Sequence, residues 1–313
     1  MKLISIVTPC YNEEENVREV NRQVKEVFER LPGYTFEHIF IDNASTDKTV
    51  QVLREMAAED KKVKVIVNSR NFGHIRSPFH AFLQTKGDAA TILAADLQEP
   101  PVLIYDFIKK WEAGYKIVIA IKRKSAENKL MFFLRRMYYK LVKKMADIEL
   151  VQNFGGYGLY DRKVIEILRE VNDPYPYFRG LICEIGFERA EIEFDLAVRK
   201  KGKTKNNIYT LFDMAMLGIT SHSKVPLRLA TMMGFFGATI SILIAAGYFV
   251  YKLIFWDSFT VGIAPLVIGL FFFGAVQLFF IGILGEYIGA IFTHVQKRML
   301  VVEKERINFE EGK

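Results

Sequence analysis

The chain has 313 residues, enough for one large domain or two ordinary ones, and its mean hydropathy of +0.11 indicates a membrane-embedded part. A net charge of +7 predicts anionic partners such as phosphates, nucleotides or acidic lipid headgroups. Nucleic acid is not expected, because the sequence has neither zinc-finger spacing nor an RNA-binding signature. The two cysteines, Cys10 and Cys183, lie far apart and outside any CxxC, which argues against a cysteine metal site.

The first 122 residues alternate short apolar runs with amphipathic segments. Strands are expected at 3–9, 35–42, 62–68, 88–96 and 115–122. Helices are expected at 13–31, at 46–60 with Ser45 as its N-cap, at 76–87 and at 100–114. This alternation predicts an α/β fold of the Rossmann-like type with a mainly parallel sheet. In such folds ligands bind beyond the carboxyl ends of the strands.

Two later segments combine apolar and basic faces. Residues 128–148 predict a helix with an aliphatic and aromatic face and a strongly basic remainder, which is typical of a helix lying on a membrane surface. An ordinary packed helix with a solvated basic face is the alternative. Residues 207–224 form a second, weaker candidate for an interfacial helix.

Two long uncharged runs predict a transmembrane hairpin. They extend from Leu229 to Tyr251 and from Val261 to Gly285, about 23 and 25 residues, and each is long enough to cross a bilayer as a helix. Lys224 and Arg228 precede the first run, and Lys297 and Arg298 follow the second. Because basic residues favour the cytoplasmic side, both termini are expected in the cytoplasm of a multi-pass inner-membrane protein. The expected division is a cytosolic domain at 1–222, the hairpin at 223–295 and a cytosolic tail at 296–313.

The segment "ADLQEPP" provides the clearest candidate for a metal site. The sequence has no GxGxxG after the first strand and no GxxxxGK[ST], so another arrangement must hold an anion. Asp96 follows the fourth expected strand, and Gln98 offers an amide oxygen two residues later. Mg²⁺ or Mn²⁺ accepts one or two such oxygen ligands from a protein and takes the rest from phosphates and water. The alternative for an isolated acid here is a turn or cap residue.

The order of motifs resembles that of a family 2 glycosyltransferase with the GT-A fold. It is most similar to the polyprenyl-phosphate glycosyltransferases, which include dolichol-phosphate mannose synthase and bacterial membrane-anchored relatives. The motifs that carry the resemblance are "TPCYNEEEN", "IDNASTDKT", "SRNFGH", "ADLQEPP", "YGLYDRKV", "FRG", "GKTK" and "VPLRLATMMGF", followed by "GEYIG". The resemblance covers the chain from about Leu3 to Arg298.

The resemblance implies a function and a set of partners. It implies inverting transfer of a hexose from a nucleotide-diphosphate sugar, with a UDP-hexose favoured, to polyprenyl (undecaprenyl) phosphate at the cytoplasmic face of the membrane. It also implies Mg²⁺ or Mn²⁺ as cofactor, and glycines in the expected spans make a homo-oligomer an expectation. A polyprenyl phosphate is already an oxyanion near neutral pH, so positioning and charge stabilisation matter more than a general base.

The resemblance also assigns roles to residues. The nucleotide is expected to contact Pro9, Tyr11, Glu13, Asp42, Asn43, Arg70 and Asp96. The metal is expected at Asp96 and Gln98. The acceptor phosphate is expected at Lys122, Arg136, Arg199, Lys203 and Lys205. The catalytic residues are expected to be Asp96, Lys122, Arg123 and Arg199.

Three departures from the family pattern leave alternatives open. Ala94 stands where the family has the first acid of D-x-D, "DNAS" replaces "DDGS" or "NDGS", and "NFGGYG" lacks an acid and an arginine. The alternatives are transfer to another lipid acceptor, such as diacylglycerol or a lipid-linked glycan, and a catalytically impaired scaffold. The sugar itself is not determined by the sequence.

Overall fold

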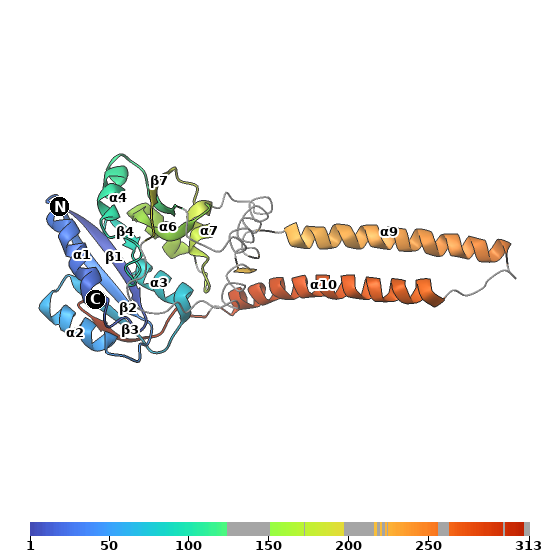
Figure 1. Cartoon of the computed structure of the whole chain (residues 1–313), viewed down its shortest axis with the longest axis horizontal. Coiled ribbons are helices and arrows are strands. Elements are labelled where there is room, and N and C mark those ends of the chain that lie inside the picture. Colours follow the sequence, from blue (N-terminus) through green and yellow to red (C-terminus); the bar gives the residue numbers. More distant parts are fainter. Residues whose placement is uncertain are drawn as a thin grey trace.

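The computed structural model describes residues 1–123, 151–171, 173–196, 216–217, 220, 223, 225–255, 263–296 and 298–309. Over these residues the chain forms an eight-stranded sheet with helices on both faces, from which two long helices project side by side (Figure 1). The predicted α/β fold with a mostly parallel sheet is confirmed. The predicted helix at 128–148 lies outside the described residues. Of the predicted helix at 207–224, the structure describes residues 216, 217, 220 and 223.

The sheet has the strand order β7-β5-β6-β4-β1-β2-β3-β8. Its strands are β1 (Lys2–Cys10), β2 (Tyr34–Asp42), β3 (Val63–Asn68), β4 (Ala89–Ile92), β5 (Ile117–Lys122), β6 (Phe154–Asp161), β7 (Arg189–Phe194) and β8 (Glu303–Ile307). β1 lies between β2 and β4 and is parallel to both, whereas β6 and β8 are antiparallel to their neighbours. Successive strands therefore lie on one side of β1 as far as β3, and the next strand, β4, lies on its other side. Open α/β sheets bind ligands where the strand order reverses in this way.

Helices cover the sheet in two layers. They are α1 (Val17–Glu29), α2 (Thr49–Glu59) and α4 (Leu103–Glu112) on one face, and α3 (Gly73–Leu83), α6 (Arg162–Glu170) and α7 (Phe178–Glu184) on the other. The alternation of side chains along a strand explains both layers. Ile4 and Ile6 pack toward α1 and α4, whereas Val7 packs toward α3 and α6. Cys10 is buried in the cluster that packs against α2.

Several predicted boundaries were wrong for identifiable reasons. α1 begins at Val17 rather than at residue 13, because residues 13–16 form a turn that the β2–α2 loop holds. α2 begins at Thr49, and Ser45 does not cap it; the Ser45 hydroxyl donates to Asp42 instead. β4 ends at Ile92, so the chain has already left the sheet four residues before Asp96.

The segment expected as a cytosolic tail completes the sheet. β8 pairs antiparallel with β3 and covers what would otherwise be its open edge. Arg54 and His80 contact Glu305 and Glu303 at 2.5 and 2.6 Å, so both helical layers bind this strand. The sequence did not predict β8, because its five residues are mostly charged and its partner strand is more than two hundred residues away.

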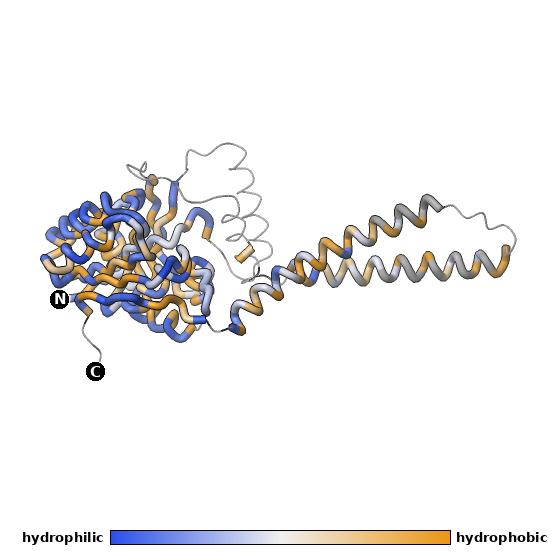
Figure 2. The backbone as a smooth tube through the Cα atoms, turned by 90° about the horizontal axis from the view of Figure 1, so that it is seen from below, coloured by the Kyte–Doolittle hydropathy of each residue, from blue (hydrophilic) through white to orange (hydrophobic). Residues whose placement is uncertain are grey.

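The two projecting helices are α9 (Val225–Ile254) and α10 (Ile263–Val295), and Figures 1 and 2 show them extending together away from the sheet. Among the described residues, one helical stretch, Phe272–Val295, is long and apolar enough to cross a membrane. The second expected span ended at Gly285, but α10 continues ten residues further. Tyr287 lies within that continuation and is buried, and its hydroxyl donates to the Ser223 carbonyl oxygen.

A buried histidine makes the stability of the fold depend on pH. His38 is fully buried in β2, where its ring nitrogens contact Thr8 Oγ1 at 2.9 Å and Asn21 Oδ1 at 3.0 Å. Burial, and then the charge of Lys25, lower the pKa of His38 from 6.5 to about 3. The unfolded chain therefore binds a proton below pH 6.5 that the folded chain does not. The stabilising contribution is complete above pH 6.5 and is lost as the pH falls.

Between pH 7.5 and pH 5.5, we expect the free energy of unfolding of the full chain in detergent to fall by about 1.4 kcal/mol because of His38. The midpoint of thermal unfolding should fall by roughly 3 °C over this range. His38→Gln cannot titrate, so its midpoint should change less between the two pH values. Equal slopes for the two proteins would show that His38 does not cause the acid sensitivity.

Candidate active site

The polar loops that follow β1, β2, β3 and β4 meet at one edge of the sheet. The register places Cys10 beside Asp42, and Asp42 beside Val67. Beyond β4, the Leu93 amide still donates to the Val7 carbonyl oxygen at 2.8 Å, and Ala95 packs in the same cluster as Cys10. The loop that carries Asp96 therefore lies against the end of β1, at the reversal point of the sheet.

Hydrogen bonds join the loop after β1 to the loop after β2. The Asn12 amide donates to Ser45 Oγ at 2.8 Å, and the Thr46 amide donates to Asn12 Oδ1 at 2.8 Å. The Glu13 amide donates to Thr49 Oγ1 at 2.9 Å. Because each loop supplies the other with hydrogen-bond partners, the two loops stabilise one another. Pro9, Tyr11 and Glu13 are partly exposed along it.

Asp42 is the buried acid of this pair of loops. Its side chain is fully buried and accepts hydrogen bonds from the Ser45 amide, at 3.0 Å, and from the Ser45 hydroxyl. Burial raises the pKa of Asp42 above its ordinary value, although the hydrogen bonds from Ser45 oppose this rise. Ala44 between them has a φ of 62°, a left-handed conformation that an alanine rarely adopts. The turn is thus held by side-chain contacts rather than by a glycine.

Asn43 ties the end of β2 to the loop after β3. Its amide nitrogen donates to Asn71 Oδ1 at 2.9 Å, and its oxygen accepts from the Phe72 amide at 2.9 Å and from Asn68 Nδ2 at 3.1 Å. These contacts occupy the Asn43 side chain with the protein itself. Its expected contact with base or ribose stays a prediction, and the structure shows it positioning the loop that carries Arg70.

Arg70 is exposed beside this loop. Its guanidinium lies 4.0 Å from the centre of the Phe72 ring, and its Nη1 donates to the Asn71 carbonyl oxygen at 3.1 Å. Stacking on an aromatic ring leaves the edge of a guanidinium open to an anion. Arg70 therefore lies at the correct edge of the sheet for the expected nucleotide contact.

The Asp96 loop offers two oxygen ligands. Asp96 is partly exposed, and its Oδ1 accepts a hydrogen bond from the Gln98 amide nitrogen at 3.2 Å. Leu97 between them has a φ of 58°, so the loop turns sharply at this point. The described residues contain no cluster of three histidine, cysteine or acidic side chains that could enclose a metal ion. One carboxylate and one amide oxygen fit a hard cation whose remaining ligands are phosphate oxygens and water.

Glu99 is a site residue that the sequence analysis missed. Its carboxylate is 12% exposed, accepts from the Ala94 amide at 3.5 Å and lies 3.8 Å from Lys122 Nζ. Burial raises the pKa of Glu99 to about 7, while the charge of Lys122 opposes the rise. The acid therefore lies beside position 94, where the family pattern has an acid and this chain has alanine. In the sequence, the one sign of a role for Glu99 is its position within "ADLQEPP". The sequence does not show which of the two acids in this segment, Asp96 or Glu99, has the buried carboxylate.

Lys122 reaches this loop from the end of β5, whereas Arg123 does not. Arg123 Nε donates to Glu193 at 3.0 Å, and its Nη1 lies 3.8 Å from Asp195, so the side chain turns toward β7. The geometry gives no support for the expected catalytic role of Arg123. Arg136, Arg199, Lys203 and Lys205 lie outside the described residues, so their expected roles stay predictions.

Gly155 allows the Lys122 ammonium to approach Glu99. A β-carbon at position 155 would lie 3.2 Å from both Cε and Nζ of Lys122 and 3.6 Å from Glu99 Oε1. We expect Gly155→Ala to move the flexible lysine end by a few tenths of an ångström. Activity should fall severalfold in steady-state assays while the midpoint of thermal unfolding stays constant, since no backbone atom is displaced. A large drop in the midpoint would instead indicate a backbone role for Gly155.

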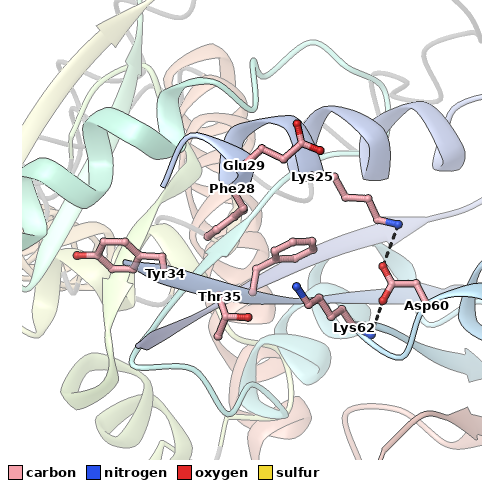
Figure 3. A pocket seen from close by; sticks show the side chains of 8 residues that line it. Lys25, Phe28, Glu29, Tyr34, Thr35, Asp60 and Lys62 are labelled. Atoms are coloured by element: carbon pink, nitrogen blue, oxygen red, sulfur yellow. Dashed lines mark hydrogen bonds and ion pairs between the residues drawn. The ribbon is translucent and has the colours of Figure 1, made fainter. Parts of the chain in front are cut away.

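A shallow groove of about 430 Å³ lies at the opposite edge of the sheet (Figure 3). It is lined by Lys25, Phe28, Glu29, Tyr34, Thr35, Phe36, Asp60 and Lys62. Lys25 is paired with Asp60 at 2.8 Å, and the Lys62 ammonium lies 5.0 Å from the centre of the Phe36 ring. Because the groove is at the amino end of β2 and both lysines have intramolecular partners, it is not the candidate site.

Comparison with known proteins shows which family the chain matches. The family model described as glycosyl transferase family 2 matches residues 5–168. The SfII prophage-derived bactoprenol glucosyl transferase of Shigella flexneri is 33% identical over 303 residues, which cover 96% of this chain and 97% of that protein. The uncharacterized glycosyltransferase YkcC of Bacillus subtilis is 33% identical over 98% of this chain and 94% of its own.

A solved structure agrees on the fold. Glucosyl-3-phosphoglycerate synthase from Mycobacterium tuberculosis, in complex with Mn²⁺, UDP and phosphoglyceric acid, matches with a TM-score of 0.50 at 16% identity. The match covers 70% of this chain and 76% of that one. The family model spans more than half of the chain, and the curated relatives extend over nearly all of it. The chain belongs to glycosyl transferase family 2.

Proposed function

We propose that this glycosyltransferase transfers a hexose from a UDP sugar to a polyprenyl phosphate of the bactoprenol type at a membrane surface. The observation that carries the proposal is the identity of about 33% to bactoprenol glucosyl transferases over 96% of the chain, including the region of α9 and α10. The site favours the same chemistry. It combines hard oxygen ligands on the Asp96 loop with a cation, Lys122, on the neighbouring strand.

The reaction is a single displacement. An acceptor phosphate oxygen attacks the anomeric carbon from the face opposite the diphosphate. The bond from that carbon to the diphosphate breaks, UDP leaves with the electron pair, and the configuration at the anomeric carbon is inverted. Mg²⁺ or Mn²⁺, bound through Asp96 and Gln98, would stabilise the charge on the leaving group. Lys122 would orient the acceptor phosphate, with Glu99 fixing the ammonium. No general base is required, because the acceptor is ionised.

The membrane placement is part of the same proposal. Among the described residues, Phe272–Val295 is the one helical stretch long and apolar enough to cross a membrane, and α9 beside it includes the uncharged run from Leu229 to Tyr251. Two spans with both termini in the cytoplasm fit the basic residues at the sheet end of both helices. Gly234, Gly274 and Gly282 have no neighbouring atoms within 4 Å of an added β-carbon, which favours contact with a second copy.

We expect purified full chain in detergent to transfer labelled glucose from UDP-glucose to undecaprenyl phosphate but not to diacylglycerol. Thin-layer separation of the lipid products measures both acceptors in parallel. GDP-mannose and UDP-N-acetylglucosamine serve as competing donors, because the sequence does not determine the sugar. Product on diacylglycerol would favour the alternative lipid acceptor. Binding of UDP sugar, seen as a thermal shift, with no product on either lipid would favour an impaired scaffold.

A further inference from the structure

Three arginines converge where the end of α10 meets the loop after β3. Arg70 and Arg76 both lie against the Phe72 ring, with guanidinium carbons 4.0 and 5.3 Å from its centre. Arg298 follows α10 by three residues, and its charge acts on Arg76. Arg76, in the first turn of α3, donates from Nη2 to the Met299 carbonyl oxygen, which connects α3 to the segment that follows α10. We name Arg70, Arg76 and Arg298 the arginine cluster.

The charge of the arginine cluster is not balanced within the described part of the chain. Burial, then the charges of Arg70 and Arg298, lower the pKa of Arg76, and the opposing effect comes from Tyr175 rather than from a carboxylate. Arg76 Nε is also buried without any hydrogen-bond partner. A buried N–H of a charged group without a partner costs free energy, and three like charges repel one another. An anion with several oxygens would offset the repulsion among the three guanidinium groups.

The surroundings of the arginine cluster are apolar and exposed. Phe292, Val295 and Met299 are 61%, 71% and 71% exposed at the end of α10. Figure 2 shows this end of the hairpin joining the polar α/β part of the molecule. An apolar helix end next to guanidinium groups matches the boundary between acyl chains and phosphate headgroups. Free phosphate would contact only the guanidinium groups, whereas a lipid would contact the guanidinium groups with its phosphate and the apolar side chains with its acyl chains.

We propose that the arginine cluster binds the phosphate of an anionic bilayer lipid such as phosphatidylglycerol and thereby fixes the sheet against the membrane. The proposal rests on the membrane placement given under the proposed function. A guanidinium matches phosphate with two parallel N–H donors, and Arg70 and Arg76 both lie against the Phe72 ring. Arg70 also lies at the expected nucleotide site, so the tests rely on Arg76 and Arg298.

The test measures lipid binding rather than sugar transfer. Full chain in neutral detergent is titrated with dioctanoyl-phosphatidylglycerol or dioctanoyl-phosphatidylcholine, and the thermal unfolding midpoint is recorded. Phosphatidylglycerol is expected to raise the midpoint, and phosphatidylcholine is not. Arg76→Gln and Arg298→Gln should each weaken the apparent affinity about fivefold, and the double variant about 25-fold. Separate arms with inorganic phosphate and UDP distinguish a free anion and the donor from the lipid.

The control removes two charges elsewhere. Lys109→Gln with Lys110→Gln on the exposed face of α4 should keep the affinity for phosphatidylglycerol. If Arg76→Gln unfolds, the exposed Arg298→Gln still tests the proposal. Unchanged phosphatidylglycerol affinity in Arg298→Gln, an equal response to phosphatidylcholine, or saturation by inorganic phosphate alone would overturn it. A chain that binds the lipid but transfers no sugar would leave this inference standing and refute the proposed function.

Discussion

Asp96→Ala is expected to lower the rate of sugar transfer at least about a hundredfold. The substitution removes the partly exposed carboxylate that is expected to bind the divalent cation, and with it the stabilisation of the leaving diphosphate. The loop should keep its shape, since Asp96 is partly exposed and its Oδ1 accepts a hydrogen bond of 3.2 Å from the Gln98 amide. The measurement is the initial rate of lipid-linked sugar formation, with the thermal unfolding midpoint recorded on the same samples.

Asp106→Ala provides the matched control, because Asp106 is an exposed acid on α4 ten residues along the chain. It should leave the rate unchanged. EDTA should abolish transfer by the unaltered chain, and added Mg²⁺ or Mn²⁺ should restore it. Asp96→Ala protein that retains most of its activity, or an unaltered chain that is indifferent to EDTA, would contradict the metal role of Asp96.

Lys122→Gln and Glu99→Gln are each expected to reduce kcat/KM at least about tenfold, and the double variant should lose no more than the worse single one. The reason is that the two side chains act as a unit. Glu99 Oε1 lies 3.8 Å from the Lys122 ammonium, and Gly155 leaves that approach free. Without the carboxylate the ammonium is not aimed at the acceptor phosphate. Residues that act together give strongly non-additive losses.

Lys116→Gln is the control for this pair. Lys116 immediately precedes β5 and contacts Asp161 at 3.2 Å, so it belongs to the opposite end of the strand that delivers Lys122. It should not alter kcat/KM. The acceptor KM should rise in both site variants while the KM for the UDP sugar changes little. Losses that simply multiply in the double variant would show that Glu99 and Lys122 act independently.

The α/β fold could be predicted because local patterns carry it. The apolar run of β1 and the regular apolar spacing of α1 report which side of each element is buried. The residues of "ADLQEPP" could also be recognised, since a turn with a carboxylate has a local signature. The uncharged runs near the C-terminus indicated long helices in the same way, and α9 and α10 are both helical there.

The sequence by itself therefore determined the class of fold, the family and the edge of the sheet that carries Asp96. Tertiary structure alone decided three features that depend on residues distant in the chain. β8 is a strand because β3 offers it an unpaired edge. The pKa of Glu99 is raised because the carboxylate is buried, although it lies beside Lys122. The Arg123 side chain points away from the Asp96 loop because Glu193 of β7 binds it. Short-range periodicity reports local geometry, but burial and charge pairing are settled only when distant segments pack together.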